Sequence, residues 1–401
     1  MPIRNAIAAM KDEFARYRHE LHMTPQTAYE EIYASTFVQN KLAEWDIAYK
    51  SGYGKTGVVA TIEGEQNNSG KAIGLRADMD ALDIEEQTGL EHASQNPGKM
   101  HACGHDGHTT MLLAAAKYLN ETRNFDGRVH LIFQPAEEGD QGADAMMADG
   151  LFDDFPCDSV FAVHNWPWLQ RGQIAMREGP IMAAVDEFEI TLHGKGGHAA
   201  FPQGNADPVV AASHLVTALQ SIISREVDPM DTAVLSITNI TAGTGASNVI
   251  PDRAYISGTV RSFQPATRDY IKARLKEMLE HMAPALCMYS TELEYHPVID
   301  PTINTRAGIA TSAEAARAAV GDDNVTTDIP ACMGGEDFGA FLQQKPGAYV
   351  FIGQGEQDDA DSPHNQGLHS PFFDFNDEII PIGVEYFTQL IEQALPAKKA
   401  S

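Results

Sequence analysis

The stretch from Arg76 to His108 concentrates side chains that bind metal ions, and this constrains how the rest of the chain can fold. Thiolate, imidazole and carboxylate groups are the three side-chain types that hold borderline divalent metals. In this stretch they are Asp78, Asp80, Cys103, His105 and Asp106. Because so short a segment cannot close a metal site alone, the fold has to bring further ligands to it from distant parts of the chain.

The further ligand candidates stand mainly where apolar, strand-like runs end. Glu137 and Glu138 follow RVHLIFQPA, and His164 follows DSVFAV. Another candidate is His369 in NQGLHSPFF. Because open α/β sheets bind ligands beyond the carboxyl ends of their strands, we expect the first three side chains at one shared edge of a sheet.

Length and charge limit the possible architectures and partners. A chain of 401 residues predicts two domains or more. The formal net charge of −28, from 56 acidic and 28 basic residues, repels nucleic acid and anionic lipid. No run approaches the roughly 18 apolar residues of a membrane-spanning helix. The sequence therefore predicts neither a nucleic-acid nor a membrane partner.

The cysteines and the N-terminal residues favour a cytoplasmic location. Cys103, Cys157, Cys287 and Cys332 lack the spacing of a disulfide framework. In the N-terminal residues, Lys11, Asp12 and Glu13 interrupt any apolar region too early for a secretory signal.

Strand-like and helical patterns alternate in the first part of the chain and again in the last part, which is typical of an α/β domain. We expect helices over 3–21 and 109–120, and strands over 128–134 and 159–164. The β-like segments 58–63 and 73–76 flank the polar stretch EGEQNNSGK, which predicts a hairpin-like turn. After residue 297, helices over 307–320 and 382–394 flank a strand over 349–352.

Between these parts the pattern changes. From Asp186 the order is strand, helix, strand, strand, helix, strand, which is the ferredoxin-like arrangement. We therefore expect a two-domain α/β protein, with residues 1–183 and 297–401 forming one domain and residues 184–296 inserted as a second. Pro180 and Pro297 are hinge candidates.

The pair Glu137-Glu138 indicates acid–base chemistry beside a metal. Adjacent carboxylates cannot point the same way from an extended backbone, so one can bind metal while the other accepts a proton from water and passes it to a leaving amine. Alternatively, the two glutamates are solvent-exposed surface residues without a role in catalysis. Cys103 in Cys-Gly-His could likewise be a buried structural cysteine. His101 and His108 compete with His105 as ligands, and HExxH is absent.

Nine motifs, in this order and spacing, carry a resemblance to a known family. They are RADMDAL, HACGHDGHT, FQPAEEG, VFAVHNWP, GKGGHAAFP, ASNVIPD, GTVRSF, GGEDF and LHSPFFDFND. Together they resemble the M20-type metallopeptidases of the amidohydrolase branch, which includes hippurate hydrolases, N-acyl-amino-acid deacetylases and auxin-conjugate hydrolases. The resemblance covers nearly the whole chain from Arg18 onward.

The resemblance implies a hydrolase-like catalytic α/β domain that holds two divalent metals, with an inserted lid domain that makes a homodimer or a higher oligomer. It implies five metal ligands, with Glu137 as general base. The implied ligands are Cys103, His105, Glu138, His164 and His369. Mixed ligands of these types admit Zn, Mn, Co or Ni.

The resemblance also implies roles for residues around the metals. Asp80 corresponds to the acid that orients a ligand, and Asp78 stands where the wider family has a metal-binding histidine. His198 resembles the histidine that reaches the partner subunit's site and stabilises the oxyanion. Asn248 and Arg261 look like substrate-binding positions, Arg261 on a carboxylate.

Three departures from the branch's pattern leave the implied ligands untouched. Asp83 stands in place of the usual Pro, Gln203 replaces a frequent His, and Thr24-Pro25-Gln26 replaces a Pro-Glu pairing.

The expected activity is hydrolysis of an N-acyl amino acid, with an N-acetyl or N-aroyl group, to a carboxylate and a free amino acid. A dipeptidase or aminopeptidase on the same scaffold and a metal-dependent binding protein without catalysis are the alternatives.

Overall fold

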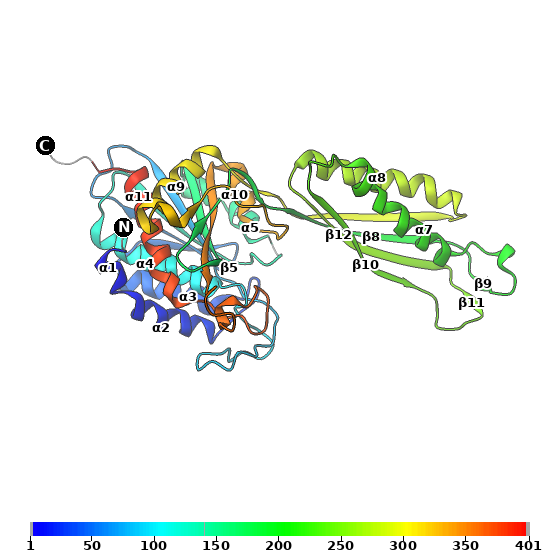
Figure 1. Cartoon of the computed structure of the whole chain (residues 1–401), viewed down its shortest axis with the longest axis horizontal. Coiled ribbons are helices and arrows are strands. Elements are labelled where there is room, and N and C mark those ends of the chain that lie inside the picture. The colour runs from blue at the N-terminus through cyan, green and yellow to red at the C-terminus, as the bar shows by residue number, and fades with distance from the viewer. Residues whose placement is uncertain (1–2, 140, 398–401) are drawn as a thin grey trace. The chain divides into compact units, whose positions relative to one another are not determined.

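The computed structural model describes residues 3–139 and 141–397, and the chain divides into two compact units (Figure 1). The large unit is Met1–Ile181, Thr302–Ala331 and Asp337–Ser401. The small unit is Met182–Pro301 with Cys332–Glu336. The expected insertion 184–296 falls inside the small unit, and the short segment Cys332–Glu336 adds to it, with Ala183 donating its backbone N–H to Gly334 at 2.9 Å.

An eight-stranded mixed sheet forms the centre of the large unit, in the order β1-β2-β4-β3-β5-β16-β6-β15. The strands β4, β3, β5 and β16 run parallel to one another, whereas β2 is antiparallel to β4 and to β1. The strand bounds are β1 Tyr49–Tyr53, β2 Gly57–Glu63, β3 Ala72–Asp78, β4 Arg128–Gln134, β5 Ser159–Gln170, β6 Ile174–Ala175, β15 Val325–Thr326 and β16 Gly347–Gly355.

The predicted hairpin between residues 58–63 and 73–76 is wrong. These residues belong to β2 and β3, but β4 lies between the two strands and pairs with both. Both strands are almost wholly buried, and β4 lies between them in the interior of the sheet. The polar stretch 63–71 predicts a turn but does not indicate which strands pair.

Helices pack around this sheet, and the helix α11 lies against both α4 and α9. The predicted helix over 3–21 is two helices, α1 and α2, separated at Ala9 and Met10. The helix bounds are α1 Asn5–Ala8, α2 Lys11–His22, α3 Ile32–Glu44, α4 His105–Thr122, α5 Gly142–Ala148, α6 Leu151–Asp154, α9 Arg306–Val320, α10 Phe338–Gln344 and α11 Ile380–Ala394.

The small unit is a four-stranded antiparallel sheet in the order β10-β12-β8-β13, with two long helices. Along the chain the order is β8, α7, β10, β12, α8, β13, the ferredoxin-like order predicted from the sequence. The bounds are β8 Ala184–His193, α7 Pro208–Ser221, β10 Ala233–Ala242, β12 Arg253–Ser262, α8 Pro265–Ala285 and β13 Ser290–Ile299. Short strands β9 Gly197–His198 and β11 Val249–Ile250 pair beside this sheet, and β7 Gly179–Met182 pairs with β14 Thr302–Asn304.

Among the described residues, no helix has both the length and the apolar composition that crossing a membrane requires.

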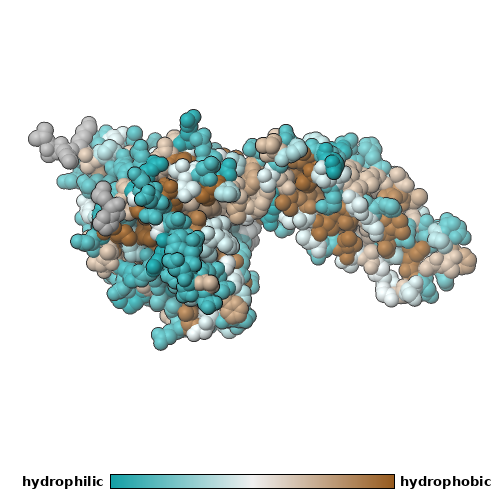
Figure 2. All heavy atoms as spheres, viewed as in Figure 1, coloured by the Kyte–Doolittle hydropathy of each residue, from teal (hydrophilic) through white to brown (hydrophobic). Residues whose placement is uncertain are grey.

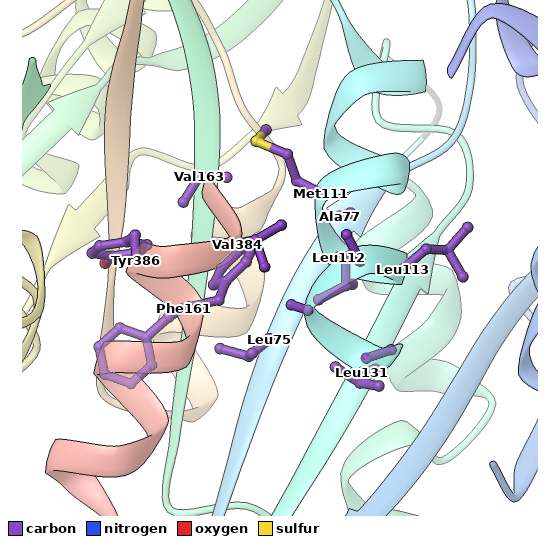
Figure 3. Close-up of a cluster of buried hydrophobic side chains, with 14 of the residues drawn as sticks. Leu75, Ala77, Met111, Leu112, Leu113, Leu131, Phe161, Val163, Val384 and Tyr386 are labelled. Atoms are coloured by element: carbon purple, nitrogen blue, oxygen red, sulfur yellow. The ribbon is translucent and has the colours of Figure 1, made fainter. Parts of the chain in front are cut away.

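The core of the large unit joins the parallel strands to α4 and α11, as Figure 3 shows. Leu75 of β3 and Leu131 of β4 are fully buried, and Phe161 of β5 is 2% exposed. Met111 comes from α4 and Val384 from α11. This packing fixes the strands whose carboxyl ends carry the functional side chains.

Replacing Leu75 by Ala removes buried methyl groups from this core. We expect the free energy of unfolding of the large unit to fall by about 2–5 kcal/mol. All three tryptophans lie in the large unit, so denaturant titration followed by tryptophan fluorescence measures this unit's unfolding. Ile32→Ala, at a side chain that is 65% exposed, is the control and should change stability by less than about 0.5 kcal/mol. Equal effects of the two variants would contradict this account of the core.

Candidate metal centre

Four segments of the large unit bring the five predicted ligands together. Cys103 lies in the loop before α4, and His105 is the first residue of α4. Glu138 follows β4, and His164 lies within β5. His369 lies in a loop, with a left-handed φ of 62°, and its backbone N–H donates to the carbonyl of Ala102 at 2.9 Å.

The ligand atoms of these side chains lie close to one another. Cys103 Sγ is 3.4 Å from His164 Nε2, and His369 Nε2 is 3.2 Å from Glu138 Oε1. His105 Nε2 is 3.8 Å from Glu138 Oε1 and 4.0 Å from Glu137 Oε2. Three overlapping groups, each with ligand atoms within 4.8 Å of one another, contain all of these residues. They are Cys103, His105 and His164; Cys103, Glu138 and His369; and His105, Glu137 and Glu138.

Asp80 orients two members of this cluster. His105 Nδ1 lies 2.9 Å from the Asp80 carbonyl oxygen and 3.2 Å from Oδ1, which turns Nε2 toward the other ligands. The second carboxylate oxygen of Asp80 accepts the backbone N–H of Glu138 at 2.9 Å. Nε2 of His105 is buried and makes no hydrogen bond within the described residues. An imidazole held at one nitrogen, with its other nitrogen bare, is the arrangement of a metal ligand.

The cluster carries an excess of negative charge, and this fits a cation. Burial and the carboxylates of Glu138, Glu137 and Asp78 raise the pKa of the Cys103 thiol well above its usual value. Burial opposes protonation of His105, but Asp78, Asp80 and Glu138 outweigh it and raise the pKa of His105 to about 10. A divalent cation would relieve this charge, so the donor set fits a metal site.

His108 and Asp78 lie beside the cluster and are bonded to other groups. His108 Nδ1 is 2.6 Å from Asp78 Oδ1, and its Nε2 is 2.7 Å from Asn165 Oδ1. Arg76 donates to the other oxygen of Asp78 at 2.7 Å. Burial would raise the pKa of the Asp78 carboxyl, but His105, Arg76 and His108 hold it well below its usual range. Asp78, His105 and His108 also form a possible ligand group, but both ring nitrogens of His108 already have partners.

His101, the other competing histidine, belongs to none of the possible ligand groups that the described residues form. Its ring is buried and lies 6.2 Å from the ring of His22, and burial lowers the pKa of His101 to about 4.

The loop between β4 and α5, which carries Glu137 and Glu138, is clamped by two acids that the sequence analysis missed. Glu31 accepts the backbone N–H of Ala136, a residue with a left-handed φ of 54°, at 3.0 Å. Asp337 accepts from the Gln134 side chain at 2.7 and 2.8 Å and from the backbone N–H of Ala143 at 2.9 Å. Asp337 therefore ties the start of the loop to its end. The GGEDF motif was the only sequence sign of this role.

Comparison with known proteins decides the family of this chain. The model of Peptidase family M20/M25/M40 matches residues 74–393. The chain belongs to this family. Hippurate hydrolase from Campylobacter jejuni is 38% identical over 384 residues, covering 96% of this chain and 97% of that protein. N-acetyl-L-cysteine deacetylase from Bacillus subtilis is 38% identical over 382 residues, covering 95% and 88%.

A solved structure agrees with this placement. The YXEP protein of Bacillus subtilis, described as a dinuclear metal binding peptidase from the M20 family, has a TM-score of 0.83 and 33% identity, and the match covers 97% of this chain and 99% of that one. The chain is a metal-dependent hydrolase of the M20 family with a ligand set for two divalent ions.

The remaining predicted site residues of this M20 hydrolase lie in the small unit, with Arg261 in its four-stranded sheet and His198 and Asn248 at the separate β9–β11 pair. His198 of β9 pairs with Val249 of β11, and Asn248 accepts the backbone N–H of Ala199 at 3.0 Å, so His198 and Asn248 are neighbours. Arg261 pairs with Val185 at the start of β8, and burial lowers the pKa of Arg261. Eight residue steps along β8 lead from Val185 to His193, the last residue before the connection to β9, which is about 26 Å at roughly 3.3 Å per residue.

A buried ionic network anchors the helix that begins with His105. Arg18 and His22 of α2 both lie against Asp106 Oδ2, at 3.0 and 2.9 Å. The side chains of all three residues are at most 1% exposed. Burial opposes the charge on His22, but the Asp106 carboxylate outweighs it and raises the pKa of His22 to about 9.

This network predicts a pH dependence of stability. Folded His22 binds its proton more tightly than unfolded histidine, whose pKa is 6.5, so its contribution is fully present below pH 6.5 and is lost as pH rises through about 9. Between these pH values the wild type should lose on the order of 3 kcal/mol of unfolding free energy because His22 gives up its proton. The variant His22→Gln should not show this loss. Denaturant titrations of the metal-stripped protein at several pH values measure it.

His296→Gln, at an exposed histidine of the small unit, is the matched control and should leave the slope of stability against pH unchanged. If His22→Gln and the wild type show the same slope between pH 6.5 and 9, the charged state of His22 does not stabilise the fold.

Proposed function

We propose that this M20 family member hydrolyses the amide bond of N-acyl amino acids and releases a carboxylate and a free amino acid. The observation that carries the proposal is the position of Glu137, a carboxylate 7% exposed, beside a complete ligand cluster and 4.0 Å from His105 Nε2. The names of the two similar enzymes, a hippurate hydrolase and an N-acetylcysteine deacetylase, support the substrate class.

In this proposal Cys103, His105, Glu138, His164 and His369 hold the two metal ions, and Asp80 keeps His105 and Glu138 in position. Two divalent ions bound there would polarise the amide carbonyl and lower the pKa of the attacking water. Zinc, manganese, cobalt and nickel all suit this mixed set of ligands.

Glu137 acts as general base and then as general acid. Its carboxylate accepts a proton from the water that attacks the carbonyl carbon, and it returns this proton to the nitrogen of the departing amino acid. The clamped loop holds this carboxylate at the cluster, because Glu31 and Asp337 fix the backbone on both sides of Glu137 and Glu138.

The small unit supplies the remaining groups. Arg261 binds the substrate carboxylate, while Asn248 binds substrate and His198 donates a hydrogen bond to the oxyanion. Since Arg261 pairs with the start of β8 and His198 lies in β9, beyond the other end of β8, we infer that they serve a given substrate from different subunits of a homodimer.

Replacing Glu137 by Gln keeps the size of the side chain and removes the base. We expect kcat for N-acetyl and N-benzoyl amino acids to fall by at least about 100-fold, with the metal content per subunit unchanged. Rates come from amino acid release, and metal content from elemental analysis. A panel of free dipeptides, which we expect to be poor substrates, separates this activity from that of a dipeptidase.

Glu138→Gln is the neighbouring control, and it should lose bound metal as well as activity. A Glu137→Gln variant that retains activity would remove Glu137 from its role, and a wild-type enzyme that prefers free dipeptides would overturn the substrate class.

The homodimer would form through the small unit. Nine of the thirteen exposed large hydrophobic side chains of the described residues lie in this unit, and Figure 2 shows hydrophobic residues over it. The strand β10 is an edge strand, exposed from Thr238 to Ala242, and an unpaired edge can add a second copy of the chain.

Ile240, which is 53% exposed on β10, is the test position. We expect Ile240→Lys to shift the protein from dimer to monomer and to reduce activity, because a charge at the interface is desolvated without a partner. Sedimentation velocity measures the shift. Met230→Lys, at a side chain 90% exposed outside β10, is the control. A dimeric Ile240→Lys variant would exclude this edge as the interface.

A further inference from the structure

The strand that carries His164 continues past it with two tryptophans. Trp166 and Trp168 both belong to β5, which ends at Gln170. Trp168 is 57% exposed, although most of the preceding strand is buried. One of the largest apolar side chains is thus left open on the strand that carries His164.

Ring contacts link these tryptophans to the metal ligands. The rings of His164 and Trp166 lie 6.2 Å apart at 79°, and those of Trp166 and Trp168 lie 4.8 Å apart at 66°. The Trp166 ring is stacked on Phe351 of β16 at 4.0 Å and 17°. Trp166 is therefore held on a buried strand, and it holds the Trp168 ring in turn.

The loop that carries His369 reaches the same indole. A Cβ at Gly367 would lie 3.5 Å from Cζ2 of Trp168, so this backbone passes directly against the ring. Phe372, three residues after His369, is 47% exposed. Of the four exposed large hydrophobic side chains in the described part of the large unit, Trp168 and Phe372 thus belong to segments that carry ligands.

We propose that Trp166 and Trp168 form an aromatic shelf that binds the acyl group of the substrate, and that this group is aromatic. The inference rests on the proposed function and names the acyl class: N-aroyl and N-arylacetyl amino acids over N-acetyl ones. An aromatic acyl group would gain binding free energy on a fixed indole, because it buries apolar area and makes edge or face contacts with the ring. A methyl group has little area for either kind of contact.

The test compares acyl groups while the amino acid stays constant. We expect Trp168→Ala to lower kcat/KM for N-benzoylglycine about tenfold while kcat/KM for N-acetylglycine changes less than twofold. Trp168→Phe, which keeps an aromatic ring, should retain most of the activity on N-benzoylglycine. Tyr49→Ala, at a 37% exposed aromatic residue on the edge strand β1, is the matched control and should affect neither substrate.

Four results would overturn the shelf. Trp168→Ala could lower kcat/KM for both substrates equally, or it could leave kcat/KM for both unchanged. It could instead alter the preference among N-acetyl amino acids with different side chains, which would place the amino acid on the indole. It could also change the sedimentation coefficient, which would place a second copy of the chain there.

A binding measurement separates failure of the shelf from failure of the proposed function. Calorimetry of the metal-loaded Glu137→Gln protein should give tighter binding of N-benzoylglycine than of N-acetylglycine, and the added Trp168→Ala should remove the difference. If the wild type hydrolyses neither amide, the proposed function is wrong, yet this difference would still support the shelf. Equal binding of the two compounds would overturn it.

Discussion

The structure depends on burying several acidic groups at one point. Glu137, Asp78 and Asp80 are buried, and Glu138 nearly so, beside the buried Cys103 thiol and the His105 and His164 rings, while His369 is about half exposed. Such a concentration of like charge is costly unless cations neutralise it. The raised pKa values of Cys103 and His105 have this same cause. The cluster therefore fits a metal site. The surrounding residues hold the ligand side chains in place without binding the atoms that would contact the metal.

Acidic side chains that contact the ligands or their loop hold the ligands in place. Asp80 orients His105 and fixes the backbone of Glu138, while Glu31 and Asp337 close the loop from either side. The left-handed conformation of Ala136 costs energy in a residue with a Cβ, and it persists because its backbone N–H is bonded to a buried carboxylate. The turn at this point lets both adjacent glutamates reach the cluster, where their ligand oxygens lie within 4.8 Å of each other, so the two side chains do not point apart as the expected extended backbone would require.

The two units contribute different chemistry. The large unit contains the whole ligand cluster and the aromatic shelf, and its parallel strands deliver both to one edge of the sheet. The small unit offers a histidine and an asparagine at one end and an arginine at the other. Along β8, about 26 Å at roughly 3.3 Å per residue separate Val185, the partner of Arg261, from His193, and β9 follows beyond it; this separation is the physical reason for proposing two subunits at each site.

The sequence by itself determined the chemical types of the ligands and the place of Glu138 after a strand, because residue types and the end of β4 can be read from local pattern. The expected place of His164 at a strand end is wrong, because β5 continues to Gln170. The sequence also determined the order β-α-β-β-α-β of the small unit. Only the tertiary structure decided that β4 separates β2 from β3, that His105 faces the cluster while His108 does not, and that Glu31 and Asp337 hold the loop. The direction of a loop side chain depends on hydrogen bonds to residues distant in the chain. The hydrophobic periodicity of the sequence does not reveal these bonds.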